Sequence, residues 1–158
     1  MTGIAIIFDD AQLGAAAERL VGLTGRQSRL DMLDAIGAIA ESGARRRLQE
    51  EKAGPDGEPW AEWAEATRER REPHHSLLQY RGDLLDSIAF EVSPDGTSVK
   101  VGSPLPYAAI QQLGSADEDD GAGPVIPARP YLGLSAEDRA DIEDAIQRQI
   151  DRLIGGGV

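Results

Sequence analysis

The 158-residue chain contains no cysteine, which excludes disulfide bonds and thiolate metal sites and leaves a reducing cytosol compatible with the sequence. Aromatic residues are also scarce, with only two tryptophans, three tyrosines and two phenylalanines. The predicted core therefore consists mainly of leucine, isoleucine, valine and alanine. A chain of this length is typical of one domain that buries about two thirds of its unfolded surface.

Long apolar runs are missing as well. No segment approaches the ~18 consecutive apolar residues that a transmembrane helix needs. The N-terminal sequence MTGIAIIFDD lacks the basic region that begins a signal peptide. We therefore expect no membrane partner, and we expect the protein to stay in the cytoplasm in which it is made.

Positive charge is in the minority, because 16 basic residues face 28 acidic residues and give a formal charge of −12. Such a surface repels phosphate, so free nucleic acid is not expected as the main partner. The two basic clusters are Arg45–Arg47, expected to be a solvated helix end, and the group Arg68, Arg70 and Arg71. Contact with acidic patches of a neighbouring subunit is their more natural use.

Motifs for catalysis and metal binding are scarce. The two histidines, His74 and His75, are adjacent and point in different directions, which makes a weak metal pair. The acidic run Asp117–Asp120 lacks the alternating ligands of a calcium loop. No nucleophile elbow or phosphate-binding glycine motif occurs. We predict no catalytic residue, cofactor or metal, with a small carboxylate-dependent hydrolase as the competing interpretation.

Hydrophobic periodicity predicts an α+β fold. Alternation indicates a first strand at residues 3–8 and a β-hairpin whose strands cover about 88–92 and 99–101. The hairpin turn is Ser93-Pro94-Asp95-Gly96. Because these strands are few and antiparallel, the expected architecture is a small antiparallel β-sheet with helices packed on one face.

Helical spacing of apolar residues indicates four helices, and a turn with a further short helix is expected within residues 77–87. The first is short, at about 13–21, and Asp9 and Asp10 suit its N-terminal cap. The longest covers about 28–50, a short one covers 107–113, and the last covers about 135–153. Ser135 and Asp138 resemble a capping box at the start of the last helix, with Asp replacing the usual Glu or Gln.

Two segments without regular structure interrupt this single domain of residues 1–158. Residues 53–75 are rich in glycine and proline and predict a protruding arm with a short helical piece. Residues 115–123 predict a mobile acidic loop, and residues 124–134 an extended segment packed on the body.

Four short motifs follow one another between residues 57 and 135. They are Gly57-Glu58-Pro59-Trp60; Leu77-Leu78 with Gly82-Asp83-Leu84 and Ser87-Ile88; Val101-Gly102-Ser103 with Tyr107-Ala108, Gln111-Gln112 and Gly114; and Ile126-Pro127-Ala128-Arg129-Pro130-Tyr131-Leu132-Gly133-Leu134-Ser135. Together, in this order, they resemble the phage virion morphogenesis family, which includes the tail completion proteins of Mu-like phages. Arg81 and Gln111 stand where threonine and histidine are common in that family.

The resemblance implies a structural protein, not an enzyme, that acts in tail completion or head–tail joining. Because tail tubes have sixfold symmetry, we expect a ring of six copies that contacts tail tube, sheath or neck proteins, and DNA only where it passes through the ring. The location implied is the host cytoplasm during assembly and then the tail or neck of the virion. A tail assembly chaperone that is not retained, and a DNA-binding regulator, are alternatives.

Eight residues are candidates for interface contacts, mostly on the arm and in the matched motifs. They are Trp60, Trp63, Arg68, Arg71, Tyr107, Gln111, Arg129 and Tyr131. Trp60 and Trp63 suit either the core or an anchor for a neighbour, and Arg129 suits either a contact or an internal latch. For Tyr107 and Tyr131, packing in the core or at its rim is the more common role. Gly82, Gly102 and Gly114 are expected at turns.

Overall fold

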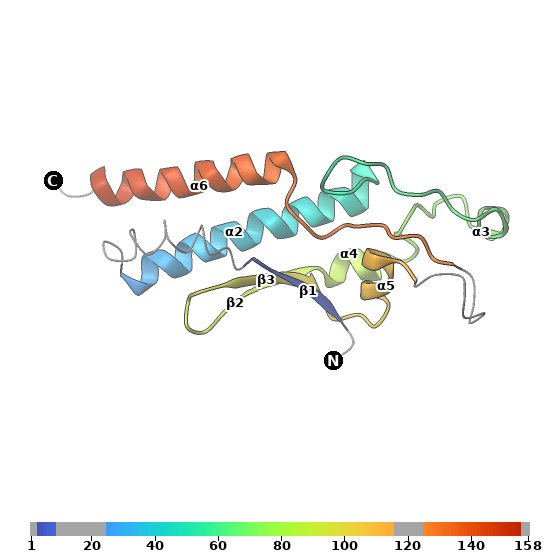
Figure 1. Cartoon of the computed structure of the whole chain (residues 1–158), viewed down its shortest axis with the longest axis horizontal. Coiled ribbons are helices and arrows are strands. Elements are labelled where there is room, and N and C mark those ends of the chain that lie inside the picture. Colours follow the sequence, from blue (N-terminus) through green and yellow to red (C-terminus); the bar gives the residue numbers. More distant parts are fainter. Residues whose placement is uncertain (1–2, 9–24, 116–124, 156–158) are drawn as a thin grey trace.

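The computed structural model (Figure 1) describes residues 3–8, 25–115 and 125–155. The predicted helix at 13–21, its capping residues Asp9 and Asp10, and the acidic loop after Ser115 lie outside these residues. The described segments have the predicted α+β fold. None of the helices in these segments has the length and apolar character needed to cross a membrane.

Three antiparallel strands form the sheet in the order β1-β3-β2. They are β1 (Ile4–Phe8), β2 (Ala89–Val92) and β3 (Val99–Ser103), and Val101 lies opposite Ile6 on one side and Phe90 on the other. The predicted first strand and hairpin are confirmed. Val99 and Val101 are buried while Lys100 is exposed, so strand alternation turns one face of the sheet toward the helices.

Gly102 was expected at a turn, and that expectation is wrong. It lies in the central strand β3 opposite Ala5 of β1, and a Cβ atom there would overlap the Ile4 carbonyl oxygen and Ala5. The close approach of two strands is therefore what the glycine permits. The other two expectations are confirmed, since Gly82 and Gly114 have φ angles of 88° and 79°.

Two long helices stack over the sheet (Figure 1). Helix α2 (Arg26–Arg46) packs against β2 and β3 and continues into the π-helical turn η1 (Arg47–Glu51). Helix α6 (Ala136–Gly155) packs alongside α2. The short helices α4 (Asp83–Ser87) and α5 (Ala108–Leu113) lie near one end of the sheet, and α3 (Glu65–Arg70) lies on the predicted arm. The predicted long helix, final helix, short helices before and after the hairpin, and helical piece of the arm are confirmed.

Small residues on α2 let the helix lie close to the sheet. Ala40 and Ala44 are buried, and a Cβ atom at Gly37 would overlap the ring of Phe90 from β2. Leu48 and Ile88 are fully buried in the same core. Aliphatic side chains thus make up most of the interior, as the scarcity of aromatic residues predicted.

Arg47 corrects the expectation that the Arg45–Arg47 cluster is a solvated helix end. Its side chain is fully buried, and its Nη1 atom lies 2.8 Å from Oδ2 of Asp138, which is 1% exposed. Arg47 also donates to the backbone carbonyls of Tyr131 (2.9 Å) and Gly133 (2.7 Å). The physical reason is helical spacing: residue 47 continues the buried face of Ala40 and Ala44.

Asp138 also caps α6. Its Oδ2 atom accepts from the Ser135 backbone N–H (2.9 Å), and its own N–H donates to Ser135 Oγ (3.1 Å). The predicted capping box is therefore confirmed. Burial alone would raise the pKa of Asp138, but the hydrogen bonds from Arg47 and Ser135 lower it below the ordinary value of 3.8.

Replacing Asp138 should destabilise the fold severely. We expect Asp138→Ala to lower the free energy of unfolding by about 3–5 kcal/mol, because it leaves the buried Arg47 guanidinium without its counter-ion. Asp144→Ala, at an exposed position of the same helix, is the control and should change it by less than about 0.5 kcal/mol. Denaturant unfolding measures both, and equal small effects would contradict the role given to the pair.

The same carboxylate predicts a pH dependence. Because its pKa is lower in the folded chain than in the unfolded chain, its stabilising contribution is present above about pH 4 and disappears as the pH falls through the folded-state value. The stability difference between the wild-type protein and Asp138→Asn should therefore shrink between pH 6 and pH 2. A difference that stays constant over this range, in denaturant unfolding at each pH, would refute the assignment.

Candidate functional site

The base of the arm is fixed to the body by Trp60. The Ala53–Pro59 backbone bridge folds the arm back on itself, and the Trp60 backbone N–H donates to the Lys52 carbonyl (2.9 Å). The indole is 5% exposed, and its Nε1 atom donates to the Pro130 carbonyl at 2.9 Å. Trp60 therefore anchors the arm inside its own chain.

Arg129 forms the second attachment of the arm. Its side chain is buried, and it donates from Nε to the Ala61 carbonyl (2.9 Å) and from Nη2 to the Glu62 carbonyl (3.1 Å). Desolvation lowers the pKa of the guanidinium, and the nearby charge of Glu62 raises it. Of the two roles left open by the sequence, the structure shows the internal latch.

The extended segment 125–134 is joined to α5 by hydrogen bonds of the same kind. The Gln112 side-chain oxygen accepts from the backbone N–H groups of Tyr131 and Leu132, both at 2.9 Å. The buried Tyr131 hydroxyl donates to the Ala108 carbonyl at 2.9 Å. Burial raises the pKa of this phenol well above its usual range, so it stays a neutral donor.

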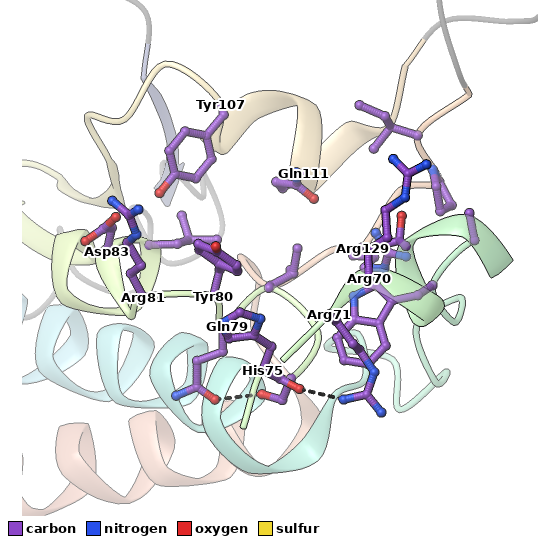
Figure 2. Close-up of a pocket in the computed structure, with 18 of the residues that line it drawn as sticks. Arg70, Arg71, His75, Gln79, Tyr80, Arg81, Asp83, Tyr107, Gln111 and Arg129 are labelled. Atoms are coloured by element: carbon purple, nitrogen blue, oxygen red, sulfur yellow. Dashed lines mark hydrogen bonds between the residues drawn. The ribbon is translucent and has the colours of Figure 1, made fainter. Parts of the chain in front are cut away.

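These attachments leave a cleft of about 780 Å³ between the arm and α5. The cleft is lined by residues of the segments 63–71, 75–84 and 125–129, together with Tyr107 and Gln111. Figure 2 shows Tyr107 and Gln111 on one side of the cleft and Tyr80 and His75 on the other. We call this space the arm cleft.

Aromatic and aliphatic side chains are unusually exposed in the arm cleft. Tyr80 is 65% exposed, Val125 is 48% exposed and Tyr107 is 41% exposed, and all three line it. Burial and the negative charge of Asp83 raise the pKa of Tyr107, which keeps its hydroxyl protonated. Exposed aromatic residues around a concavity are typical of a protein-binding surface.

The arm cleft is positively charged although the chain is acidic. Among the residues that the structure describes, the lining contains four arginines and one carboxylate, Asp83, which gives these residues a formal charge of +3. Arg70 and Arg71 line the cleft, whereas Glu65 and Glu69 on the same helical piece do not. The fold thus separates charges that alternate in the sequence.

Two of these arginines are held over aromatic rings. The Arg71 guanidinium carbon lies 4.3 Å from the centre of a Trp63 ring, and Arg71 donates to the His75 carbonyl at 3.1 Å. The Arg81 guanidinium carbon lies 5.6 Å from the Tyr80 ring, which in turn contacts His75 at 4.1 Å between ring centres. Stacked arginines keep their N–H groups available to carboxylates.

The structure brings five of the eight candidates together. Trp63, Arg71, Tyr107, Gln111 and Arg129 line the arm cleft, while Arg68 is exposed on α3 outside the lining. The remaining two, Trp60 and Tyr131, are buried in the chain, so both have the packing role that the sequence had left open beside the interface role. For the exposed candidates, an interface role remains a prediction.

Sequence reasoning missed Tyr80 and Arg81 as surface residues. The available signal was their position immediately before Gly82. This glycine has a positive φ angle and lies between a turn and the start of α4. Leu77 and Leu84 on either side are buried, so the turn leaves Tyr80 and Arg81 exposed. Among residues 3–8, 25–115 and 125–155, no group of three or more His, Asp or Glu side chains is placed to hold a metal ion.

Comparisons with known proteins agree with the sequence motifs. The model of the phage virion morphogenesis family matches residues 8–151. The chain is 31% identical over 135 residues to a protein of Escherichia phage Mu named putative capsid assembly protein G, covering 82% of this chain and 85% of that protein.

A second relative, from Haemophilus influenzae, is named Mu-like prophage FluMu G protein 2. It is 40% identical over 72 residues, which are 46% of this chain and 50% of that protein. No solved structure matches the chain significantly. With a family match over most of its length, the chain belongs to the phage virion morphogenesis family, and its role lies in the assembly of phage virions.

Proposed function

We propose that the protein completes the phage tail or joins it to the head, and that it does so by assembling into a ring of six copies. Family membership supports the assembly role, and the sixfold symmetry of tail tubes supports the copy number. The partners beyond the ring are tail tube, sheath or neck proteins. The protein works in the host cytoplasm and then in the virion.

The arm cleft is the surface that we assign to contacts between subunits. Interfaces concentrate their binding energy in aromatic and arginine side chains, and the cleft exposes Tyr80, Tyr107 and Arg81 around one concavity. A ring requires heterologous contacts, in which one patch meets a different patch on the next copy. The arm cleft can supply one of these two patches, and α3 and α5, on either side of it, lie toward one end of an elongated molecule (Figure 1).

Binding accounts for the composition of the arm cleft better than hydrolysis does. A carboxylate-dependent hydrolase needs several acids that converge with shifted pKa values. Among the described residues that line the cleft, Asp83 is the one carboxylate, and the others include aromatic and arginine side chains. This chemistry suits recognition of another protein, so we propose a structural role without catalysis.

Removing the whole arm would not test this function cleanly, because residues 53–72 include the buried Trp60 and the carbonyls that Arg129 binds. Point substitutions at exposed cleft positions leave these contacts in place.

Truncating the two cleft tyrosines should weaken self-association. We expect the double variant Tyr80→Ala with Tyr107→Ala to associate at least about tenfold more weakly, because interface aromatic residues each contribute roughly 2 kcal/mol. Light scattering after size exclusion over a concentration series measures this. Leu153→Ala, at a side chain 40% exposed like the 41% of Tyr107, is the control and should behave as wild type. Unchanged association of the tyrosine variant would contradict the assignment.

Inactivating the gene in the phage or prophage that encodes it should produce heads and tails that do not join, because an incomplete tail end offers no docking ring. Electron micrographs of lysates, with the gene supplied from a plasmid as the control, measure the joined fraction. Normal joining would refute the tail-completion role. Mass spectrometry of purified virions should detect the protein, and its absence would assign it to a chaperone that leaves the particle.

A further inference from the structure

The first half of α6 carries three acidic side chains that form no salt bridge with any residue that the structure describes. Asp141, Glu143 and Asp144 are exposed, and one cation, Arg139, lies among them. Every salt bridge between described residues involves Arg45, Arg46 or Arg47, so these three carboxylates form none. Ala140, also exposed, leaves room for another surface to approach the helix closely.

In the arm cleft, by contrast, positively charged side chains are the ones that form no salt bridge within the described part of the chain. Arg70, Arg71 and Arg81 are exposed on its walls and form no salt bridge with any residue that the structure describes. Tyr80 and Tyr107 beside them carry hydroxyl groups that also donate to carboxylates. The cleft therefore suits a ligand with several acids on a rigid support.

The two charged surfaces of one copy lie apart. Figure 1 shows α6 running away from the end of the molecule that carries α3 and α5. The Arg47–Asp138 pair and the buried Ile142 fix α6 against α2, so its acidic side faces outward. Only the α6 of another copy can reach the cleft.

We propose that the arm cleft of one copy binds the acidic surface of α6, centred on Asp141 and Asp144, of the next copy. This inference rests on the proposed function, and it names the partner of the same site. Because two different patches meet, each added copy leaves one free cleft and one free α6. The contact therefore repeats in one direction until a ring closes.

A single-stranded nucleic acid is the other ligand class that stacked aromatic and arginine side chains accommodate. The formal charge of −12 on the chain opposes it, whereas the same charge makes a second copy a suitable partner for a +3 cleft. We therefore argue for the protein partner and treat nucleic acid as an outcome of the test.

Reciprocal charge reversal tests the contact. The cleft variant carries Arg70→Glu and Arg81→Glu, and the α6 variant carries Asp141→Arg and Asp144→Arg. Each alone should self-associate roughly tenfold or more weakly, because like charges would then face each other across the interface. An equimolar mixture of the two, and a chain carrying all four substitutions, should regain association, because opposite charges face each other again.

Arg26→Glu and Asp34→Arg, at exposed positions of α2, are single-reversal controls for the two types of substitution and should associate as wild type does. Circular dichroism and thermal melting confirm that each variant is folded. Sedimentation velocity over a concentration series gives the dissociation constants.

The outcomes separate this inference from the function on which it rests. If the cleft variant weakens association but the α6 variant does not, or if no combination restores it, the cleft has another occupant and the inference is wrong while the cleft remains the contact surface. If neither variant weakens association, or the wild-type chain never associates, both assignments fail. If the cleft variant loses binding to labelled single-stranded DNA but still self-associates as wild type does, nucleic acid is the ligand of the cleft. That outcome also overturns the inference.

Discussion

The buried pair of Arg47 and Asp138 is the interaction on which the rest of the structure depends. Asp138 caps α6, and Arg47 holds the carbonyls of Tyr131 and Gly133, so one cluster fixes α2, α6 and the extended segment between α5 and α6. That segment positions Arg129, which holds the arm. The position of the arm cleft therefore depends on two buried charges whose side-chain nitrogen and oxygen atoms each have a hydrogen-bond partner.

Local periodicity predicted most of the elements because their residues contact one another over short sequence distances. The hairpin around Ser93–Gly96 and the α6 capping box are of this kind. The role of Arg47 depends on Asp138, 91 positions away, and composition alone suggested a solvated cluster. Its place in the helical repeat of Ala40 and Ala44 was the signal that was overlooked.

The sequence predicted the residue types of the candidate site but not how the fold brings these residues together. Trp63, Arg71 and Tyr107 were chosen because the arm is long and the motifs are specific, and they share one cleft. Trp60 and Arg129 were ambiguous, because burial depends on contacts about 70 residues apart in sequence, such as the 70-position separation between the indole and Pro130. Tyr80 and Arg81 escaped notice because their exposure follows from the turn that Gly82 ends.

Within the described part of the chain, the arm is attached near its base by the Ala53–Pro59 bridge, Trp60 and the Arg129 latch, and α3 beyond it has no buried residue. Substitutions along α3 therefore cost the monomer little stability. Folding therefore places few demands on the tip, and the demands on Arg70 and Arg71 come from whatever the arm cleft binds, whereas the residues that hold the base of the arm also serve the core.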